Sequence, residues 1–161
     1  MNPNPTLEDV IYRRYEPKDK ENVWNLHVLA LNQVKGLQYS HGSWEKDLED
    51  IEGFYLNPGG EFLVAESGGK LIGMGALQKI SKTCGEIKRM RVHPDCWRMG
   101  IGQNILTRLE AAAKSKGMDV LELDTTFYQV AAQKLYLKNH YREVKRGKKG
   151  PFDTIFFKKE I

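Results

Sequence analysis

The chain has 161 residues, of which 40% are hydrophobic and 29% charged, and its formal net charge is +4. This length and balance, without a low-complexity tract or an internal repeat, are typical of one compact domain, so we expect residues 1–161 to form a single domain. Two cysteines, Cys84 and Cys96, are too few and too distant for a disulfide framework or a zinc knuckle. The sequence shows neither a signal peptide nor an apolar run long enough to span a membrane. We therefore expect a soluble, cytoplasmic protein.

The first third of the chain is predicted to hold one strand, over residues 10–15, and two helices, the first over 18–35. The second helix has apolar residues at helical spacing, which predict one buried face. These residues are Trp44, Leu48, Ile51 and Tyr55. The acidic residues that we expect this helix to turn largely outward, as a solvated face, are Glu45, Asp47, Glu49, Asp50 and Glu52.

Strands over 61–66 and 70–82 are predicted to form a hairpin through Ser67-Gly68-Gly69. Cys84-Gly85 begins the next strand, and residues 86–92 alternate in character until His93-Pro94 ends it.

Gly100-Ile101-Gly102 then opens an amphipathic helix that ends at Gly117. Backbone N–H groups at a helix start have no intrahelical partner and lie at the positive end of the helix dipole, so glycines that let a ligand approach them make a phosphate site. The alternative is that these glycines serve turn geometry only. A strand over 120–125 and a helix that carries Val130, Ala131, Leu135 and Tyr136 follow.

A dinucleotide site of the Rossmann type has the same coarse order of elements. Its fingerprint wants a third glycine where this chain has Ile105, although Asp124 stands at about the spacing expected of the ribose-binding acid. Because about 90 residues of patterned sequence precede the turn, whereas a Rossmann site begins near the first strand of its domain, we do not favour this interpretation.

Val92-His93-Pro94, the Gly100-Ile101-Gly102 turn and the segment from Ala131 to Tyr141 together resemble the GNAT superfamily of acyl-CoA-dependent N-acyltransferases. The similarity covers residues from about 12 to 157 and is strongest over 86–141. It implies a fold of the α/β class, α+β type, with a mixed, mostly antiparallel central sheet of about six or seven strands flanked by about four helices. The acyl-CoA would lie between two splayed central strands, which are expected over 86–92 and 120–126.

The chain departs from the family pattern at three places. Trp97 stands where the family's phosphate signature has Gln or Arg, His140-Tyr141 replaces Gly-Phe, and Gln129 replaces Asn. Because the phosphate cradle works through backbone N–H groups, we expect acetyl-CoA binding to survive the change at Trp97. The resemblance assigns acetyl-CoA binding to Met90, Arg91, Val92, Trp97, Arg98, Met99, Gly100, Ile101, Gly102, Gln103 and Gln129.

Acetyl transfer to an amine needs a base, because an alkyl ammonium is not a nucleophile until it loses a proton. Glu86 has the offset of the catalytic glutamate in some GNAT members, and burial would raise its pKa. The alternative is a strand-edge glutamate paired with Lys88 or Arg91. Tyr136 matches the tyrosine that commonly protonates the leaving thiolate in the family, with a core aromatic as the alternative. A backbone N–H near 90–92 is the natural oxyanion donor.

The sequence therefore predicts an N-acetyltransferase that uses acetyl-CoA as co-substrate and a small-molecule or peptide amine as acceptor, by direct attack in a ternary complex. The alternative, suggested by Trp97 and His140, is a non-catalytic acyl-CoA-binding sensor or scaffold. His41 and the 147–153 loop are candidates for the walls of the acceptor pocket. The four histidines lack metal-ligand spacing, so we expect no metal. From the resemblance we also expect a homodimer.

The positive charge is concentrated at the C-terminal end. Residues 138–161 hold eight Lys or Arg against three acids, so the other 137 residues sum to −1. Residues 145–150 are interpreted as a solvated hairpin connection or as a site for an acidic partner, the adenosine phosphates or nucleic acid. No nucleic-acid-binding motif accompanies them, so we expect no nucleic-acid partner.

Overall fold

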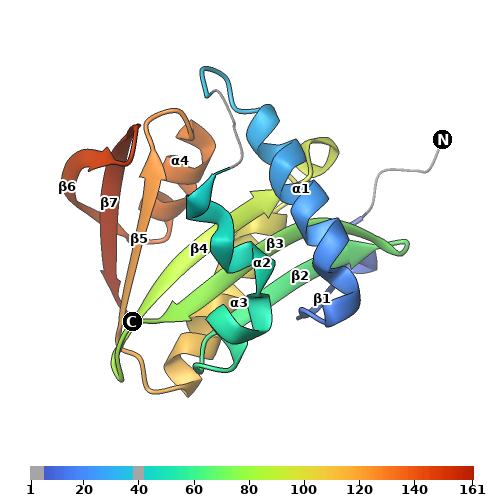
Figure 1. The fold of residues 1–161 in the computed structure, drawn as a ribbon, viewed down its shortest axis with the longest axis horizontal. Coiled ribbons are helices and arrows are strands. Elements are labelled where there is room, and N and C mark those ends of the chain that lie inside the picture. Colours follow the sequence, from blue (N-terminus) through green and yellow to red (C-terminus); the bar gives the residue numbers. More distant parts are fainter. Residues whose placement is uncertain (1–5, 38–41) are drawn as a thin grey trace.

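The computed structural model describes residues 6–37 and 42–161, and within this part a seven-stranded sheet forms the centre of the molecule (Figure 1). The strands are β1 (Ile11–Arg14), β2 (Glu61–Ser67), β3 (Lys70–Lys79), β4 (Cys84–Val92), β5 (Val120–Thr126), β6 (Arg142–Lys149) and β7 (Phe152–Glu160). Their order across the sheet is β1-β2-β3-β4-β5-β7-β6. Every neighbouring pair is antiparallel except β4 and β5, which confirms the predicted mixed, mostly antiparallel sheet.

The described chain also contains four α-helices, and they cover both faces of the sheet. They are α1 (Lys20–Asn32), α2 (Lys46–Glu49), α3 (Ile101–Ser115) and α4 (Val130–Lys138). Figure 1 shows α1 and α2 on one face of β2–β4 and α3 on the opposite face. The predicted fold class is therefore confirmed.

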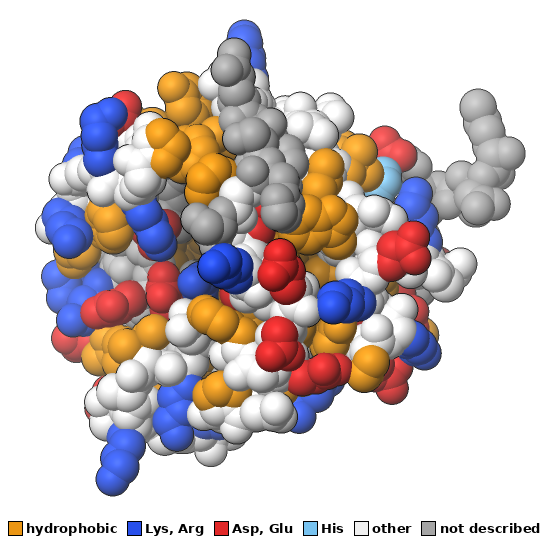
Figure 2. Space-filling model, in the orientation of Figure 1, with side chains coloured by type: hydrophobic (Ala, Val, Ile, Leu, Met, Phe, Trp, Pro, Cys, Tyr) orange, Lys and Arg blue, Asp and Glu red, His pale blue; other side chains and the backbone are white. Residues whose placement is uncertain are grey.

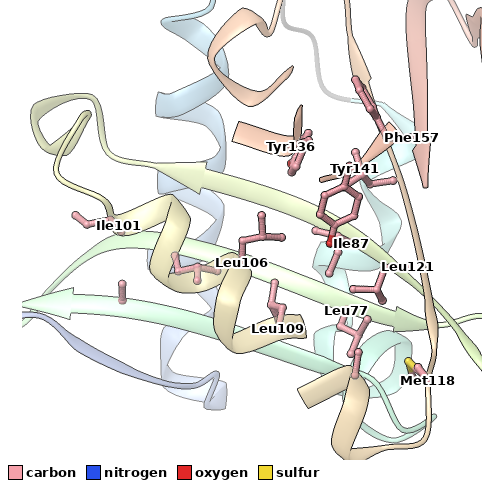
Figure 3. Packing of buried hydrophobic residues seen from close by; sticks show 14 of the residues in the cluster. Leu77, Ile87, Ile101, Leu106, Leu109, Met118, Leu121, Tyr136, Tyr141 and Phe157 are labelled. Carbon is pink, nitrogen blue, oxygen red and sulfur yellow. The ribbon is translucent and has the colours of Figure 1, made fainter. Parts of the chain in front are cut away.

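The larger hydrophobic core lies between the sheet and α3, and it extends to α4 and β7 (Figure 3). Leu106 and Leu109 of α3 are fully buried against strand residues such as Leu77 and Leu121. A side chain at Gly75 could not fit, because its Cβ would lie 2.6 Å from both Ile105 Cγ2 and Met90 Sδ. The close approach of α3 to β3 therefore depends on this glycine.

The parallel pair β4 and β5 is hydrogen bonded only at its start, from Cys84 opposite Val120 to Glu86 opposite Glu122. Beyond these residues the two strands separate, which gives the splayed central strands that the sequence resemblance implies. The separation exposes the later part of β4 and the end of β5 between the two halves of the sheet.

The predicted second helix is interrupted. It consists of the four residues of α2, a non-helical Asp50 and a π-helical turn over Glu52–Leu56. Leu48, Ile51 and Tyr55 are buried as expected, whereas Trp44 is 46% exposed.

The prediction of a solvated acidic face on this helix is wrong for two residues, since Glu45 and Asp47 are buried. Their carboxylates are bonded to His27 and Arg89, which belong to α1 and β4. Helical spacing does not reveal partners on other elements, and for this reason the prediction failed.

Residues 145–149 are not part of a hairpin connection, contrary to one interpretation, because they belong to β6. The connection to β7 is the short turn at Gly150-Pro151. Figure 2 shows basic side chains on the left side of the molecule, over β6 and β7, with acidic side chains between them. β6 lies at the edge of the sheet and is exposed along its length, so the solvated character of this segment was predicted correctly.

Candidate active site

A cavity of about 430 Å³ opens where β4 and β5 separate. Its walls come from the end of α1, the residues just before α2, the middle of β4, the end of β5, α4 and the β6–β7 turn. The predicted 147–153 wall is present through Lys149, Gly150, Pro151 and Phe152. His41, the other predicted wall residue, lies outside the described residues.

Five of the predicted site residues line this cavity: Glu86, Met90, Arg91, Gln129 and Tyr136. The others end β4, as Val92 does, follow it or begin α3, and they do not line the cavity. The predicted residues thus form two groups, one at the cavity and one at the start of α3, connected by the last residues of β4.

The Glu86 carboxylate is partly buried at the cavity, and among the described residues it has no hydrogen bond or ion pair. The neighbours that could have neutralised it are engaged elsewhere. Lys88 donates to Gln78 and lies over the Phe54 ring, and Arg91 donates to its neighbouring backbone carbonyl. The alternative of a paired strand-edge glutamate is therefore wrong. Burial raises the pKa of Glu86 above its ordinary value, which suits a group that accepts a proton near neutral pH.

Tyr136 is both a core residue and a cavity residue. Its ring packs edge-on against Tyr141 and lies next to Phe157, with centroid distances of 5.8 and 6.1 Å. The side chain is nearly buried, and burial raises the pKa of its phenol to about 12. The phenol is therefore protonated at neutral pH and can donate a proton or a hydrogen bond into the cavity.

A buried set of charged residues supports the wall of the cavity that is formed by the residues before α2 and by the middle of β4. Arg89 donates to both carboxylate oxygens of Asp47, over 2.6 and 2.9 Å, and to the backbone carbonyl of Trp44. Tyr55 donates its hydroxyl hydrogen to the same carboxylate. His27 and Glu45 form a second buried pair with an Nε2–Oε1 distance of 2.8 Å. Burial lowers the pKa of His27 to about 4, so this imidazole is neutral at pH 7.

Sequence reasoning missed this buried set, although a signal for it exists. Glu45 precedes Leu48 by three residues and Asp47 precedes Ile51 by four, so both acids share the apolar side of a helical pattern. Acidic residues at such positions indicate carboxylates that are buried with partners.

The start of α3 has the geometry of an anion site. Gly100 caps the helix in the left-handed conformation, with φ +78°, and the amides of the first residues after it precede any helical acceptor. A Cβ on Gly102 would meet only Val92 and Leu135 side-chain atoms, at 3.6 and 3.7 Å, so this glycine is not required by packing. We expect Gly102 instead to keep access to these amides open.

Three predicted cofactor side chains make bonds within the protein. The Trp97 indole donates to the Val92 carbonyl over 2.9 Å and remains about half exposed. Gln103 exchanges amide hydrogen bonds with Asn139, and Gln129 Oε1 accepts from the Thr126 amide. For Trp97, Gln103 and Gln129, the structure therefore shows a role in holding local structure. The exposed Trp97 ring and the amide nitrogen of Gln129, which lines the cavity, make no such bond.

The described residues provide neither a metal-binding cluster nor a membrane-spanning helix. No group of three His, Cys, Asp or Glu side chains there has the arrangement needed to hold a metal ion. None of the helices in that part of the chain is both long and apolar enough to cross a membrane.

A mixed sheet that opens between two parallel central strands, with a cavity at the opening and a glycine-capped helix start beyond it, has the architecture of an acyl-CoA-dependent N-acyltransferase. The model of the acetyltransferase (GNAT) family matches residues 23–141. The chain therefore belongs to the GNAT acetyltransferase family and is an acyltransferase.

The chain is similar to individual members of this family. It is 36% identical over 105 residues to the IAA acetyltransferase of Azospirillum brasilense, an alignment that covers 62% of this chain and 67% of that protein. A GNAT-family acetyltransferase structure from Staphylococcus aureus Mu50 superposes with a TM-score of 0.85 at 25% identity, over 94% of this chain and 98% of that one. A putative acetyltransferase from Salmonella typhimurium, solved with its cofactor acetyl-CoA, has the same fold, with a TM-score of 0.77 at 18% identity and 94% of each chain covered.

Proposed function

We propose that this protein transfers the acetyl group of acetyl-CoA to a primary amine by direct attack in a ternary complex. The observation that carries the proposal is the presence of an unpaired carboxylate of raised pKa, Glu86, and a protonated phenol, Tyr136, in one cavity at the opening of the sheet. A base and an acid are the two proton-transfer groups that the reaction needs.

The start of α3 fits the phosphate end of acetyl-CoA, since its free amides and the space kept by Gly102 suit an anion. Amides from Ile101 to Gln103 would hold the pyrophosphate, and the last residues of β4 would lie along the pantetheine. Acetyl-CoA binding would thus depend on the backbone, which is why Trp97 in place of Gln or Arg is compatible with it.

In the proposed reaction, Glu86 takes a proton from the ammonium form of the acceptor, directly or through a water molecule. The free amine attacks the thioester carbonyl, a C–N bond forms and the C–S bond breaks. Glu86 passes the proton of the ammonium group to solvent. As the C–S bond breaks, Tyr136 donates its proton to the departing CoA sulfur, and the proton that the attacking nitrogen loses on becoming an amide restores the phenol, directly or through a water molecule. A backbone N–H of residues 90–92 stabilises the oxyanion.

Direct transfer is favoured over an acyl-enzyme because neither Cys84 nor Cys96 is among the residues that line the cavity within the described chain. Burial also raises the pKa of both thiols, which lowers their thiolate fraction at neutral pH.

The first experiment is thermal unfolding with and without acetyl-CoA, followed by measurement of CoA thiol release with a panel of amines. Ligand at 100 times Kd adds about 2.7 kcal/mol, which raises the midpoint by roughly 5 °C or more for a domain of this size. Absence of a shift at millimolar acetyl-CoA would overturn the proposal. A shift without turnover on any amine would instead favour the sensor or scaffold alternative.

The roles of the two residues are tested by Glu86→Gln and Tyr136→Phe. Each is expected to lower kcat by about 10²- to 10⁴-fold. Glu122→Gln is the matched control, because Glu122 lies opposite Glu86 on β5 but is exposed and not part of the cavity wall. If neither active-site variant loses tenfold while the control behaves like wild type, the assigned roles are wrong.

A further inference from the structure

Arg91 lines the cavity, and its guanidinium lacks the partners that such a group normally has. Nη1 donates to the Met90 carbonyl over 2.8 Å. Nε is buried and has no hydrogen-bond acceptor, and within the described residues no carboxylate forms an ion pair with this side chain.

The other cations of the cavity wall differ from Arg91 in this respect. Arg89 is neutralised by Asp47, Lys149 is paired with Asp124 at 2.7 Å, and Lys88 lies over an aromatic ring and donates to an amide oxygen. Burial and the neighbouring Arg89 lower the pKa of Arg91 to about 10, so the guanidinium still carries its charge at neutral pH. Among the described residues, Arg91 is therefore the one cation of the cavity wall that has neither an ion pair nor a ring contact. Glu45, in the same wall, acts on it only from beyond ion-pair distance.

A buried charge without a partner lowers the stability of a folded protein, and a buried N–H without an acceptor does the same. Groups of this kind persist at functional sites, where a ligand supplies the missing partner. A planar guanidinium is suited to a carboxylate, which can accept two parallel N–H bonds from it.

The pyrophosphate of acetyl-CoA is not the partner that this geometry favours. The anion site lies at the start of α3, beyond the end of β4, whereas Arg91 lies in the wall of the cavity with Glu86 and Tyr136. The missing acceptor is thus expected on the molecule that occupies the cavity itself.

We propose that the amine acceptor of this enzyme carries a carboxylate, and that Arg91 determines this specificity by binding it. The inference rests on the proposed function, since it names the class of acceptor that the same site takes. Because the cavity has a volume of only about 430 Å³, the acceptor that it admits is a small amino acid or another compact amino-carboxylate. Glu86 receives the ammonium end of this molecule and Arg91 its acidic end.

The test measures release of the CoA thiol from acetyl-CoA in the presence of matched pairs of acceptors. Each standard amino acid, β-alanine and 4-aminobutyrate is compared with its own carboxamide. Wild type is expected to prefer the acid by at least about tenfold in kcat/KM. Arg91→Gln should lower kcat/KM for the acid by about 30-fold or more, mainly through KM, and leave the carboxamide within about twofold. Arg91→Lys should restore part of the preference, because it keeps the charge but not the fork of donors.

Arg146→Gln is the control for loss of one positive charge, since Arg146 is exposed on β6 and does not line the cavity. It should retain the wild-type preference. Equal rates on acid and carboxamide in wild type, or a preference that survives Arg91→Gln, would overturn the inference and leave the proposed function intact. If no amine of either kind is acetylated, the proposed function fails.

A second arm separates the acceptor from the acyl group as the source of the carboxylate. With succinyl-CoA and a carboxylate-free amine, Arg91→Gln should have no more than a twofold effect. A loss of tenfold or more with this pair would show that Arg91 binds the acyl chain instead and would overturn the inference.

A stability measurement detects a purely structural role. Arg91→Met keeps most of the side-chain volume and removes the unbalanced charge, so the midpoint of thermal unfolding without ligand should rise by about 2–4 °C. A lower midpoint would mean that the guanidinium stabilises the fold, and this result would contradict a role in ligand binding.

Discussion

Arg89 and Asp47 join the middle of β4 to α2 through two parallel hydrogen bonds, from Nε and Nη2 to the two carboxylate oxygens. Arg89 has a positive φ of 57°, and the register between β3 and β4 shifts around this part of the strand. A non-glycine residue in this conformation costs about 1–2 kcal/mol. The ion pair therefore holds a strained bulge in the strand that would contact both co-substrate and acceptor.

Removal of the Asp47 carboxylate should strongly destabilise the protein. In Asp47→Ala, the buried Arg89 guanidinium and the Tyr55 hydroxyl both lose their acceptor. We expect the free energy of unfolding, measured by urea denaturation, to fall by about 3–5 kcal/mol. Glu49→Ala, an exposed change on the same short helix, should stay within about 0.5 kcal/mol of wild type. Equal effects of the two substitutions would show that the pair does not stabilise the fold.

Gly102 provides a test of the phosphate site that is independent of folding. Its backbone is not in the left-handed region, and a Cβ there would make only ordinary contacts, so Gly102→Ala should leave the unfolding midpoint unchanged or slightly higher. Because the methyl group would fill space beside the free amides of α3, the Kd for acetyl-CoA, measured by calorimetry, should rise by about tenfold or more.

The comparison variant at the same turn is Gly100→Ala. Gly100 has φ +78°, so this change should lower stability by about 1 kcal/mol through backbone strain. If Gly102→Ala binds acetyl-CoA like wild type, the pyrophosphate does not lie against this part of the helix.

Much of the fold could be predicted because it depends on local patterns. The strand over 86–92, the glycine-capped helix start and the helix stop at Gly117 each belong to one element, and the structure has all three. The regular alternation expected within the strand is wrong beyond Lys88, because the bulge at Arg89 breaks it. The interrupted second helix could not be predicted, since its break at Asp50 and the burial of Asp47 depend on contacts with a distant strand.

The same limit applies to the site. Glu86 and Tyr136 are 50 residues apart in sequence, and only the resemblance placed them together; the structure brings both to one cavity. That Arg91 has no ion pair among the described residues could not be inferred from sequence, because it depends on which neighbours are already paired. Arg89, two residues away, looks equivalent in the sequence and is fully neutralised.

His140 is expected to be replaceable with a gain in stability. It follows α4 with φ 69°. Its backbone amide donates to the Leu137 carbonyl, and the amide of Tyr141 donates to the Tyr136 carbonyl. Glycine is the residue that adopts this helix-ending conformation without strain. His140→Gly should therefore raise the free energy of unfolding by about 1 kcal/mol.

His140→Ala tests the cause of that gain, since alanine removes the imidazole but keeps the requirement for positive φ. It should show no increase in the midpoint of thermal unfolding. An equal gain in both variants would attribute the effect to loss of the imidazole rather than to backbone strain.

Glu86 should couple activity and stability in opposite directions as pH changes. Burial raises its pKa in the folded protein, so the folded state binds the proton more tightly than the unfolded state. The contribution of Glu86 to stability is therefore fully present below its unfolded pKa and is lost as pH rises through the folded pKa. Glu86→Gln does not titrate, and it should match wild type in stability under acid conditions but unfold at a higher temperature above the raised pKa.

The rate should show the reverse dependence, because only the ionised carboxylate accepts a proton. In wild type, kcat/KM is expected to fall as pH decreases through the raised pKa of Glu86, whereas Glu86→Gln should lack this limb and be slower throughout. Thermal unfolding and thiol release, measured for both proteins over the same series of buffers, check the two halves together. If kcat/KM of Glu86→Gln also falls as pH decreases, another group is the base. If the difference in unfolding temperature between Glu86→Gln and wild type does not grow with pH, the Glu86 carboxylate does not carry an unbalanced charge in the folded protein.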